Sequence, residues 1–528
     1  MRAPGKTRPS LGPTLALGAS LLLALPACVP ARYQPRPIDH RLTLPTGASS
    51  LRAPGAKAAT STTTDLRTPV ASTPETSTGR EAPTDQPRER IGLAQVIRSV
   101  TTRYPLYLAK LLERDLASGR LQSAMGRFDT QLAAKVGGRL QGYYESTVAQ
   151  AGVEQPLATG DTIYGGYRIT DGFLPDYYSD RTQDDGRLFF GGRFPLLRDR
   201  SIDSRRAGVR KAEIDVELAE PKILAARIGY VQKATAIYCK WAAAGRKLVI
   251  ARELMALAEQ RQAGLQRAVE QQFLAEIALT DNERLIAQRR IYVTRAERAF
   301  QTAALELSLF LRDDADAPII AVEGNLPEQL PQLPRVERPL ADDLADAARR
   351  RPDLAALQLE VDKARTDRDL ADNQTLPNLD VVVDVATPLN DGPYSDREDL
   401  ELFVGGELKL PIQRRDARGK LLQAETRLNA LLLQQQYQRD RITNELLDAR
   451  SAIDAAERQL ADTQRNVELA EQLVTAEQRA FDLGRSDLLR VQLREAQLAD
   501  ARVLAIDAQL TVLLATADYR AALGYAGE

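Results

Sequence analysis

The octapeptide GGELKLPI at residues 405–412 decides the fold, because a counterpart, GGRFPL, stands at residues 191–196. Each copy is followed by a basic polar stretch and then by a very long helical pattern, and each is preceded by an amphipathic helical pattern and a strand-like run. The offset of about 214 residues is too long for a solenoid repeat and suits a duplicated domain half. The sequence therefore predicts one plan used twice: helix, hairpin, long helix, short helix.

Short strand-like runs surround the two copies. Residues 379–386 and 399–410 alternate apolar and polar residues around a turn rich in Pro, Gly and Asn, and residues 135–145 and 187–194 read as strands separated by a longer polar loop. Ten aromatic residues lie within residues 143–194, as in the aromatic girdles at bilayer interfaces, although an aromatic-rich soluble hairpin also fits. Each half is predicted to contribute one hairpin. Four strands cannot close a barrel in lipid, so several chains would have to pool them.

Three acidic residues lie on the polar side of the second-half strands, at Asp380, Asp384 and Glu401. We expect them to be candidates for a lumen that attracts cations. The alternative is that alternating acids only mark the solvent side of a strand.

A long uninterrupted helix is predicted over residues 416–482, which contain no proline. Apolar residues recur every seven positions from Leu446 to Phe481, and small residues such as Ala449 and Ala456 follow three positions later. This pattern predicts a coiled-coil seam with close helix approach.

Return helices follow the long helices. After Gly484, residues 486–522 form a helical pattern with apolar rows on two opposite sides, which indicates neighbours on both flanks or a place inside a bundle. The first half repeats the arrangement over residues 204–274 and 279–311, where Pro221 should kink the long helix or mark its start. Shorter helices are expected before the strands, at residues 92–134 and 340–374.

Composition excludes several classes of protein. The 528 residues include 71 Lys and Arg against 72 Asp and Glu, a net charge of −1 that does not suit a nucleic-acid binder. Repeated apolar runs of about twenty residues, which a helical membrane bundle needs, are absent from the sequence. One histidine and two cysteines leave little material for a metal site or a disulfide framework. We expect no enzyme and no cofactor; Cys239, beside Trp241, is expected to be a buried or interfacial thiol.

The N-terminus reads as a targeting segment. Residues 1–27 combine a basic start with an apolar stretch over residues 11–25, as in a signal peptide. The sequence LPAC at residues 25–28 resembles a lipobox, which predicts acylation of Cys28; the alternative is ordinary cleavage after Ala27. Residues 28–90 are rich in Thr, Ser and Pro and predict a disordered tether. The remaining domains are predicted as a first repeat at 91–312, a linker at 313–339 and a second repeat at 340–528.

Taken together, these features resemble the outer membrane efflux protein family, the TolC-like channel-tunnels. The resemblance is carried by RPDLAA at residues 351–356 leading to LPNL at 376–379, by residues 405–412, and by FDLGRSDLL at 481–489. It implies a mainly α fold with short β strands, as a homotrimer whose twelve-stranded outer-membrane β-barrel continues into a periplasmic α-helical barrel. Residues 313–339 would form its equatorial region.

The resemblance also implies a function and partners. The chain would be the passive exit duct of a tripartite efflux or type I secretion system, embedded in outer membrane lipid and working with a periplasmic adaptor protein and an inner-membrane pump. The rival interpretation is a lipid-tethered periplasmic coiled-coil adaptor or scaffold protein whose hairpins form a small separate domain. Duplicated strands of bilayer length and two-sided helix seams favour the duct.

Residues at the periplasmic tip are assigned by the same resemblance, which implies that helix–helix turns meet the adaptor there. The tip residues are Leu483, Gly484, Arg485 and Ser486 in the second half, and Ile277 and Ala278 in the first, whose turn lacks the usual glycine.

A gate is expected at the second tip, because three-fold symmetry would place carboxylates there in rings. The candidates are Asp482 and Asp487, with Arg485 as their partner. The alternative is a set of solvated charges that cap helices at a turn.

Overall fold

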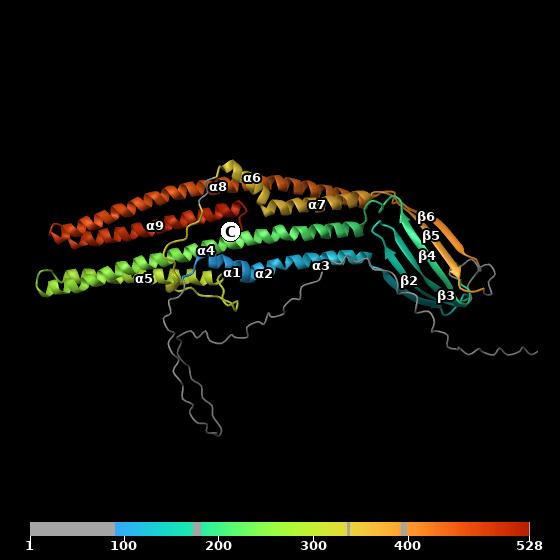
Figure 1. Ribbon diagram of the computed structural model, residues 1–528, viewed down its shortest axis with the longest axis horizontal. Helices are drawn as coiled ribbons and strands as arrows, with labels where there is room; N and C mark the ends of the chain where they lie inside the picture. Colours follow the sequence, from blue (N-terminus) through green and yellow to red (C-terminus); the bar gives the residue numbers. More distant parts are fainter. Residues whose placement is uncertain (1–89, 173–180, 335–337, 392–398, 527–528) are drawn as a thin grey trace, which may run out of the picture. The chain divides into compact units, whose positions relative to one another are not determined.

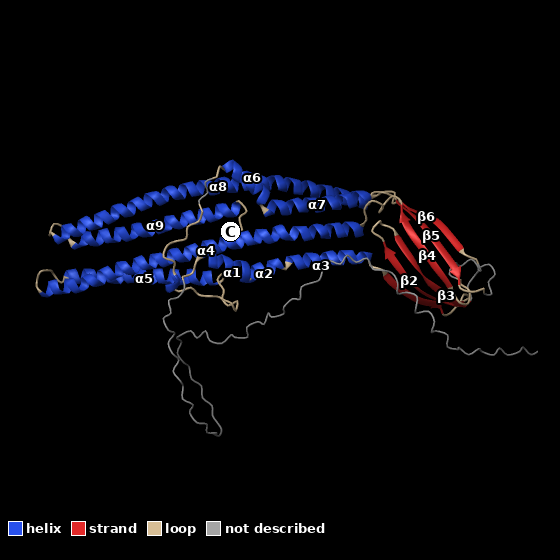
Figure 2. Ribbon diagram, viewed as in Figure 1, coloured by secondary structure: helices blue, strands red, loops and turns tan. Residues whose placement is uncertain are grey.

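The computed structural model describes residues 90–172, 181–334, 338–391 and 399–526. The predicted signal peptide, Cys28 and nearly all of the tether lie outside these residues. The described residues belong to one compact unit, in which long helices lie side by side and a sheet stands at one end of them (Figures 1 and 2). The helices are α1 (Leu93–Arg103), α2 (Pro105–Leu111), α3 (Glu113–Met125), η1 (Gly126–Phe128), α4 (Ser204–Glu270), α5 (Ile277–Ser308), η2 (Glu323–Asn325), α6 (Leu340–Arg350), α7 (Pro352–Asn373), α8 (Arg415–Asp482) and α9 (Leu488–Ala522).

The long helices of the two halves have nearly the same length and each packs against its return helix, α4 with α5 and α8 with α9. Asp203 caps the start of α4, because its Oδ1 accepts hydrogen bonds from the backbone N–H groups of Arg205 and Arg206, both at 2.8 Å. Helix α4 continues through Pro221, so this proline does not mark the start of the helix.

The seam predicted for α8 is confirmed between Leu446 and Ala470, whereas Phe481, the last residue of the predicted row, is exposed. Ala456, Thr463 and Ala470 are buried on the same helix as Leu446 and Ile453, so the small residues do lie where the helices approach each other closely. The expectation of neighbours on both flanks of α9 is also confirmed, because α9 packs against both α8 and α4.

The helices that precede the strands are broken, contrary to the expectation of single helices over 92–134 and 340–374. The first is interrupted at Tyr104, which precedes Pro105, and the second at Arg351, which precedes Pro352. A residue before proline is driven from helical to extended backbone, which explains both breaks. The Arg351 Nη1 donates to the Ala522 carbonyl at 3.1 Å, so α7 begins where α9 ends.

A single antiparallel sheet gathers the strands of both halves. In the described residues its strands pair in sequence order, and they are β1 (Gln131–Arg139), β2 (Ser146–Pro156), β3 (Thr162–Gly172), β4 (Arg187–Pro195), β5 (Asn378–Pro388) and β6 (Glu401–Lys409). The register of β4 with β5, with Gly191 opposite Asp384, joins the first half to the second.

The sheet corrects the expectation of one hairpin per half and four strands per chain. The first half supplies four strands rather than one hairpin: β2 and β3 occupy the segment that reads as a polar loop, and the strand expected at 135–145 covers the end of β1 and the following turn. These strands escape detection because β2 is rich in Ser, Thr, Ala and Gln and β3 contains two adjacent glycines, so neither shows a strong apolar alternation.

The main core lies where α1, α4 and α5 meet the segment that follows α5. Trp241, Tyr238, Phe310 and Leu307 are fully buried there. Cys239 is buried beside them, as expected from the sequence, and its burial raises the pKa of the thiol to about 12. Among the described helices, none is both long enough and apolar enough to cross a bilayer.

Candidate functional site

The sheet has one apolar face and one polar face. Directly paired residues of an antiparallel sheet point to the same side. Each face is therefore defined by one row of paired residues across all six strands, together with the residues two positions before and after them on each strand. The apolar row is Leu132, Val153, Gly165, Phe190, Val385 and Leu402, and the adjacent polar row is Gln131, Glu154, Tyr164, Gly191, Asp384 and Phe403. Among the described residues, the apolar face carries one charge, Asp171, near the end of β3.

All three acids predicted from the sequence lie on the polar face, and each has a structural partner there. The Tyr164 hydroxyl donates a hydrogen bond to Asp384, and Arg187 forms an ion pair with Glu401 at 2.9 Å. Asp380 is buried and accepts from the Asn378 side chain at 3.4 Å. Two of these contacts, here called the polar network, link distant strands: β3 with β5 through Tyr164, and β4 with β6 through Arg187. Within the described ranges, no cluster of His, Cys, Asp and Glu side chains could hold a metal ion.

Gly191 makes this network possible. A Cβ atom at this position would lie 2.1 Å from the Asp384 carboxylate and 2.7 Å from the Tyr164 ring. Gly191 therefore lies in the middle of β4 and clears space for a polar contact. Tyr164 and Arg187 were not singled out from the sequence, because their strands or partners were not recognised.

The two helix–helix turns have the same backbone design. After α8, the N–H of Gly484 donates to Phe481 and that of Arg485 to Ala480, both at 2.8 Å, which is the Schellman pattern, with Gly484 at φ +69°. After α4, Gln272 and Phe273 donate to Val269 and Ala268 at 2.9 Å, and Gln272 adopts φ +61°. The first turn keeps the conformation that glycine favours even though its sequence lacks the glycine.

Both turns expose apolar side chains. Phe273 and Ile277 are exposed at the first turn, and Leu483 and Leu489 at the second. The first turn covers residues 271–276, so Ile277 and Ala278 lie in the opening turn of α5, slightly beyond the loop itself. Exposed apolar residues gathered at a chain turn are typical of a surface that meets a protein partner.

The gate candidates surround the second turn. Asp487 caps α9 by accepting from the Arg490 N–H at 2.9 Å and also pairs with the Arg490 side chain at 3.5 Å. Asp482 accepts from Gln478 at 3.4 Å. Arg485 is exposed and forms no ion pair with either acid within the described part of this chain. A single chain therefore provides the charges but not their pairing.

A buried ionic cluster near the turns joins the two helical hairpins and was missed by sequence reasoning. Glu495 on α9 pairs with Arg261 on α4 at 2.5 Å and with Arg289 on α5 at 3.5 Å. Arg289 also donates to the Leu254 carbonyl, and its burial lowers the pKa of its guanidinium while Glu495 opposes the shift. The sequence signal for this cluster is Glu495 itself, which stands four residues after Val491 and therefore lies on an apolar side of α9, where a charge needs a partner.

Comparisons with known proteins agree with this architecture. The model of the outer membrane efflux protein family matches residues 344–525. No curated protein sequence matches the chain.

Several solved structures share the fold. The outer-membrane channel OprN has a TM-score of 0.61 at 13% identity, covering 82% of this chain and 89% of its own. The outer membrane protein VceC from Vibrio cholerae has a TM-score of 0.60 at 15% identity, covering 83% and 97%. The open state of the Neisseria gonorrhoeae MtrE outer membrane channel has a TM-score of 0.60 at 16% identity, covering 83% and 89%.

Proposed function

We propose that the chain is a member of the outer membrane efflux protein family, whose model matches residues 344–525, and that three copies form the passive exit duct of a tripartite efflux or type I secretion system. The observation that carries the proposal is the division of the sheet into an apolar face, which meets lipid, and a polar face, which lines the lumen. The helices stand in the periplasm and continue the duct. Energy for transport comes from an inner-membrane pump.

The strands have the dimensions that a bilayer requires. Each contains 9 to 11 residues, and a tilted transmembrane strand needs about 9–11. A sheet with open edges is not stable in lipid, so copies of the chain close the sheet together. The rival adaptor interpretation fits less well, because the strands of both halves form one sheet rather than a small separate domain.

The helix–helix turns are the contact surface for the periplasmic adaptor. Support comes from exposed apolar residues at two turns of the same backbone design: Ile277 and Leu489 each lie five residues after the positive-φ residue, and Phe273 and Leu483 lie next to it. Such side chains gain free energy when a partner covers them.

Arg485, Asp482 and Asp487 form the gate when three copies bring their turns together. Charge reversal by Arg485→Glu or Asp487→Arg is expected to raise single-channel conductance, because it replaces attraction between neighbouring turns with repulsion. Arg465→Glu is the control, since Arg465 is an exposed residue in the middle of α8. An unchanged conductance in both tip variants would remove these residues from the gate.

An acyl chain on Cys28 would add a second attachment to the outer membrane, with the tether facing the periplasm. One acyl chain anchors only weakly, so it supplements the strands rather than replacing them. Mass spectrometry of the mature N-terminus distinguishes an acylated Cys28 from ordinary cleavage after Ala27.

The decisive experiment is to isolate the protein from outer membranes and to record its conductance in planar bilayers. We expect SDS-resistant trimers that dissociate on heating and that form discrete channels. A protein that becomes a soluble monomer once its lipid is removed would contradict the duct and favour the scaffold.

A further inference from the structure

We propose that β1 of one copy pairs with β6 of a second copy of this chain, so that all six strands enter the barrel and three copies close eighteen strands. The inference rests on the proposed trimeric duct and determines how its copies join. It differs from the twelve strands that the family resemblance implies.

Both outer strands of the sheet have an open edge. In the described residues, β1 pairs only with β2 and β6 only with β5. All nine residues of β1 are exposed, and most of β6 is exposed too. An open row of backbone N–H and C=O groups requires a partner in lipid, and another strand edge is the partner that satisfies every group.

The directions of the two edges suit each other. β1 comes after α3 and η1, so it starts at the helices and runs away from them, whereas β6 leads into α8 and therefore runs back to them. Side by side in neighbouring copies, the two strands are therefore antiparallel, like every other pair in the sheet.

The two strands also agree in length and in the order of their side chains. Each has nine residues, and pairing Lys135 with Gly405 brings all nine into register. This register places Leu132 opposite Leu408 and Val136 opposite Val404, which continues the apolar face across the boundary. A shift by one residue would move Lys135 to the apolar side, so the alternation selects against it.

Charge on the polar face is complementary in the same register. β1 carries Lys135 and Arg139, and β6 carries Glu401 and Glu407. Arg139 lies opposite Glu401, and Lys135 lies diagonal to Glu407, within reach of long side chains. Both glutamates already have a cationic neighbour in their own chain, so the cations of the second copy extend existing ion pairs.

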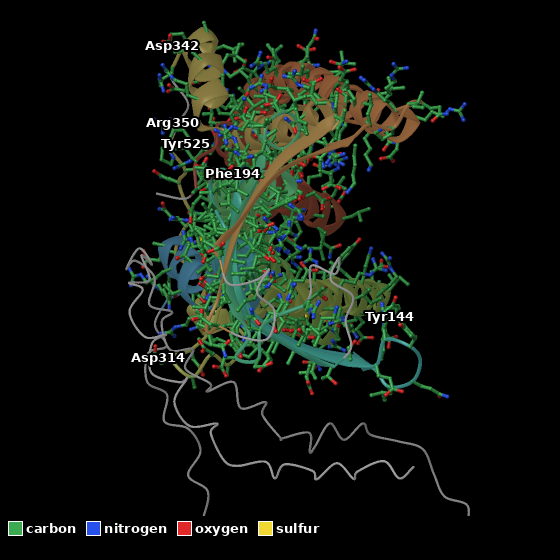
Figure 3. All side chains as sticks on the ribbon, turned by 90° about the vertical axis from the view of Figure 1, so that its right-hand side faces the viewer. Tyr144, Phe194, Asp314, Asp342, Arg350 and Tyr525 are labelled. Carbon is green, nitrogen blue, oxygen red and sulfur yellow. The ribbon has the colours of Figure 1, made fainter. Side chains whose placement is uncertain are left out.

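The β1–β2 hairpin is part of the same wall rather than an appendage. Its two ends meet beside the helices, where the Gln155 side chain donates to the Phe128 carbonyl at 2.6 Å. Its polar side continues into β3, since Arg168 donates to Gln150 at 2.8 Å. Figure 3 shows Tyr144, in the turn of this hairpin, projecting to one side of the remaining strands, as an edge that reaches a neighbour should.

The consequence is a wide duct through the membrane. The diameter of a barrel grows roughly in proportion to its strand number, so eighteen strands give about 1.5 times the diameter of twelve and about twice the cross-section. The strand region would therefore admit larger solutes than a twelve-stranded wall.

Paired cysteines test the boundary. In the full chain, Lys135→Cys with Gly405→Cys should give disulfide-linked trimers after oxidation, whereas Lys135→Cys with Val404→Cys places the thiols on opposite faces and should not. Arg168→Cys with Gly405→Cys tests a twelve-stranded wall, because Arg168 on β3 lies level with Lys135 across the sheet. The native Cys239 is buried and does not compete.

The outcomes separate this inference from the proposed function. Links from the Lys135 and Gly405 pair in intact trimers support it. Intact trimers linked only through Arg168, or through neither pair, overturn the inference and leave the duct standing, whereas the absence of trimers contradicts the duct.

A second measurement does not depend on the cysteine variants. Excision of residues 131–156 removes β1 and β2 and should leave trimers whose polymer cut-off diameter in the strand region is about 1.5 times smaller than that of the full chain. Equal polymer cut-offs for the two proteins, measured from the strand side of the bilayer, would overturn the eighteen-stranded wall.

Discussion

Removal of the Glu495 carboxylate should loosen the junction between the two helical hairpins. Glu495→Ala leaves Arg289, whose side chain is 3% exposed, without its only described carboxylate partner. The Leu254 carbonyl remains as an acceptor, but it does not balance the charge. Arg261 is 17% exposed and can turn toward water.

The magnitude follows from this difference in burial. Removal of one partner of a buried ion pair typically costs about 3–5 kcal/mol, because a charge stays buried without compensation. Since Arg261 can regain water, we expect the lower end, about 3 kcal/mol. A loss of this size corresponds to about a 100-fold larger population of the locally open state, because each 1.4 kcal/mol is tenfold.

Hydrogen exchange of the trimer in detergent measures this population. Amides of α5 and α9 around Arg289 and Glu495 should exchange about 100-fold faster in Glu495→Ala. Glu471→Ala is the matched control, because Glu471 pairs with Arg502 at 2.8 Å but both side chains are at least 40% exposed. The Glu471→Ala substitution should lower the free energy of local opening by no more than about 1 kcal/mol.

The double variant Arg289→Met with Glu495→Leu separates charge from packing. It should restore much of the lost protection, because an apolar replacement of a buried pair leaves no charge behind. The reasoning is refuted if Glu495→Ala exchanges no faster than Glu471→Ala.

Three further predictions concern the turns, the sheet and the core. Gln272→Gly should stabilise the first turn by about 1 kcal/mol, measured by thermal unfolding, because glycine adopts positive φ without a Cβ clash; a loss of stability would contradict the turn geometry. Gly191→Val should prevent stable trimers from assembling, since its side chain would occupy the space of the Asp384 carboxylate; normal yield and conductance would show that the polar network is dispensable. Tyr519 is buried and hydrogen-bonded to Asp343, and burial raises the pKa of Tyr519 to about 12, so its contribution to stability is complete below pH 10 and is lost as pH rises toward 12. Tyr519→Phe should flatten this part of the pH–stability curve in circular dichroism, and an unchanged slope would exclude the hydroxyl as its source.

Local patterns were enough to predict the long helices. The seven-residue apolar step from Leu446 onward and the small residues beside it predicted the buried seam of α8, because helix periodicity is encoded in neighbouring residues. The repeat of GGRFPL and GGELKLPI predicted the duplicated plan for the same reason. The positions of Asp380, Asp384 and Glu401 on one face followed from strand alternation.

The strand count and the contacts of the site were decided by tertiary structure. β2 and β3 have weak local preferences and become strands because β1 and β4 offer them edges to pair with. Likewise, Tyr164 meets Asp384 and Glu495 meets Arg289 across more than 200 residues of chain, which no local pattern records. The sequence by itself determined the long helices, their apolar seams and the alternation of β5 and β6, whereas pairing between distant strands and the burial of distant charges determined how many strands build the wall and what holds the hairpins together.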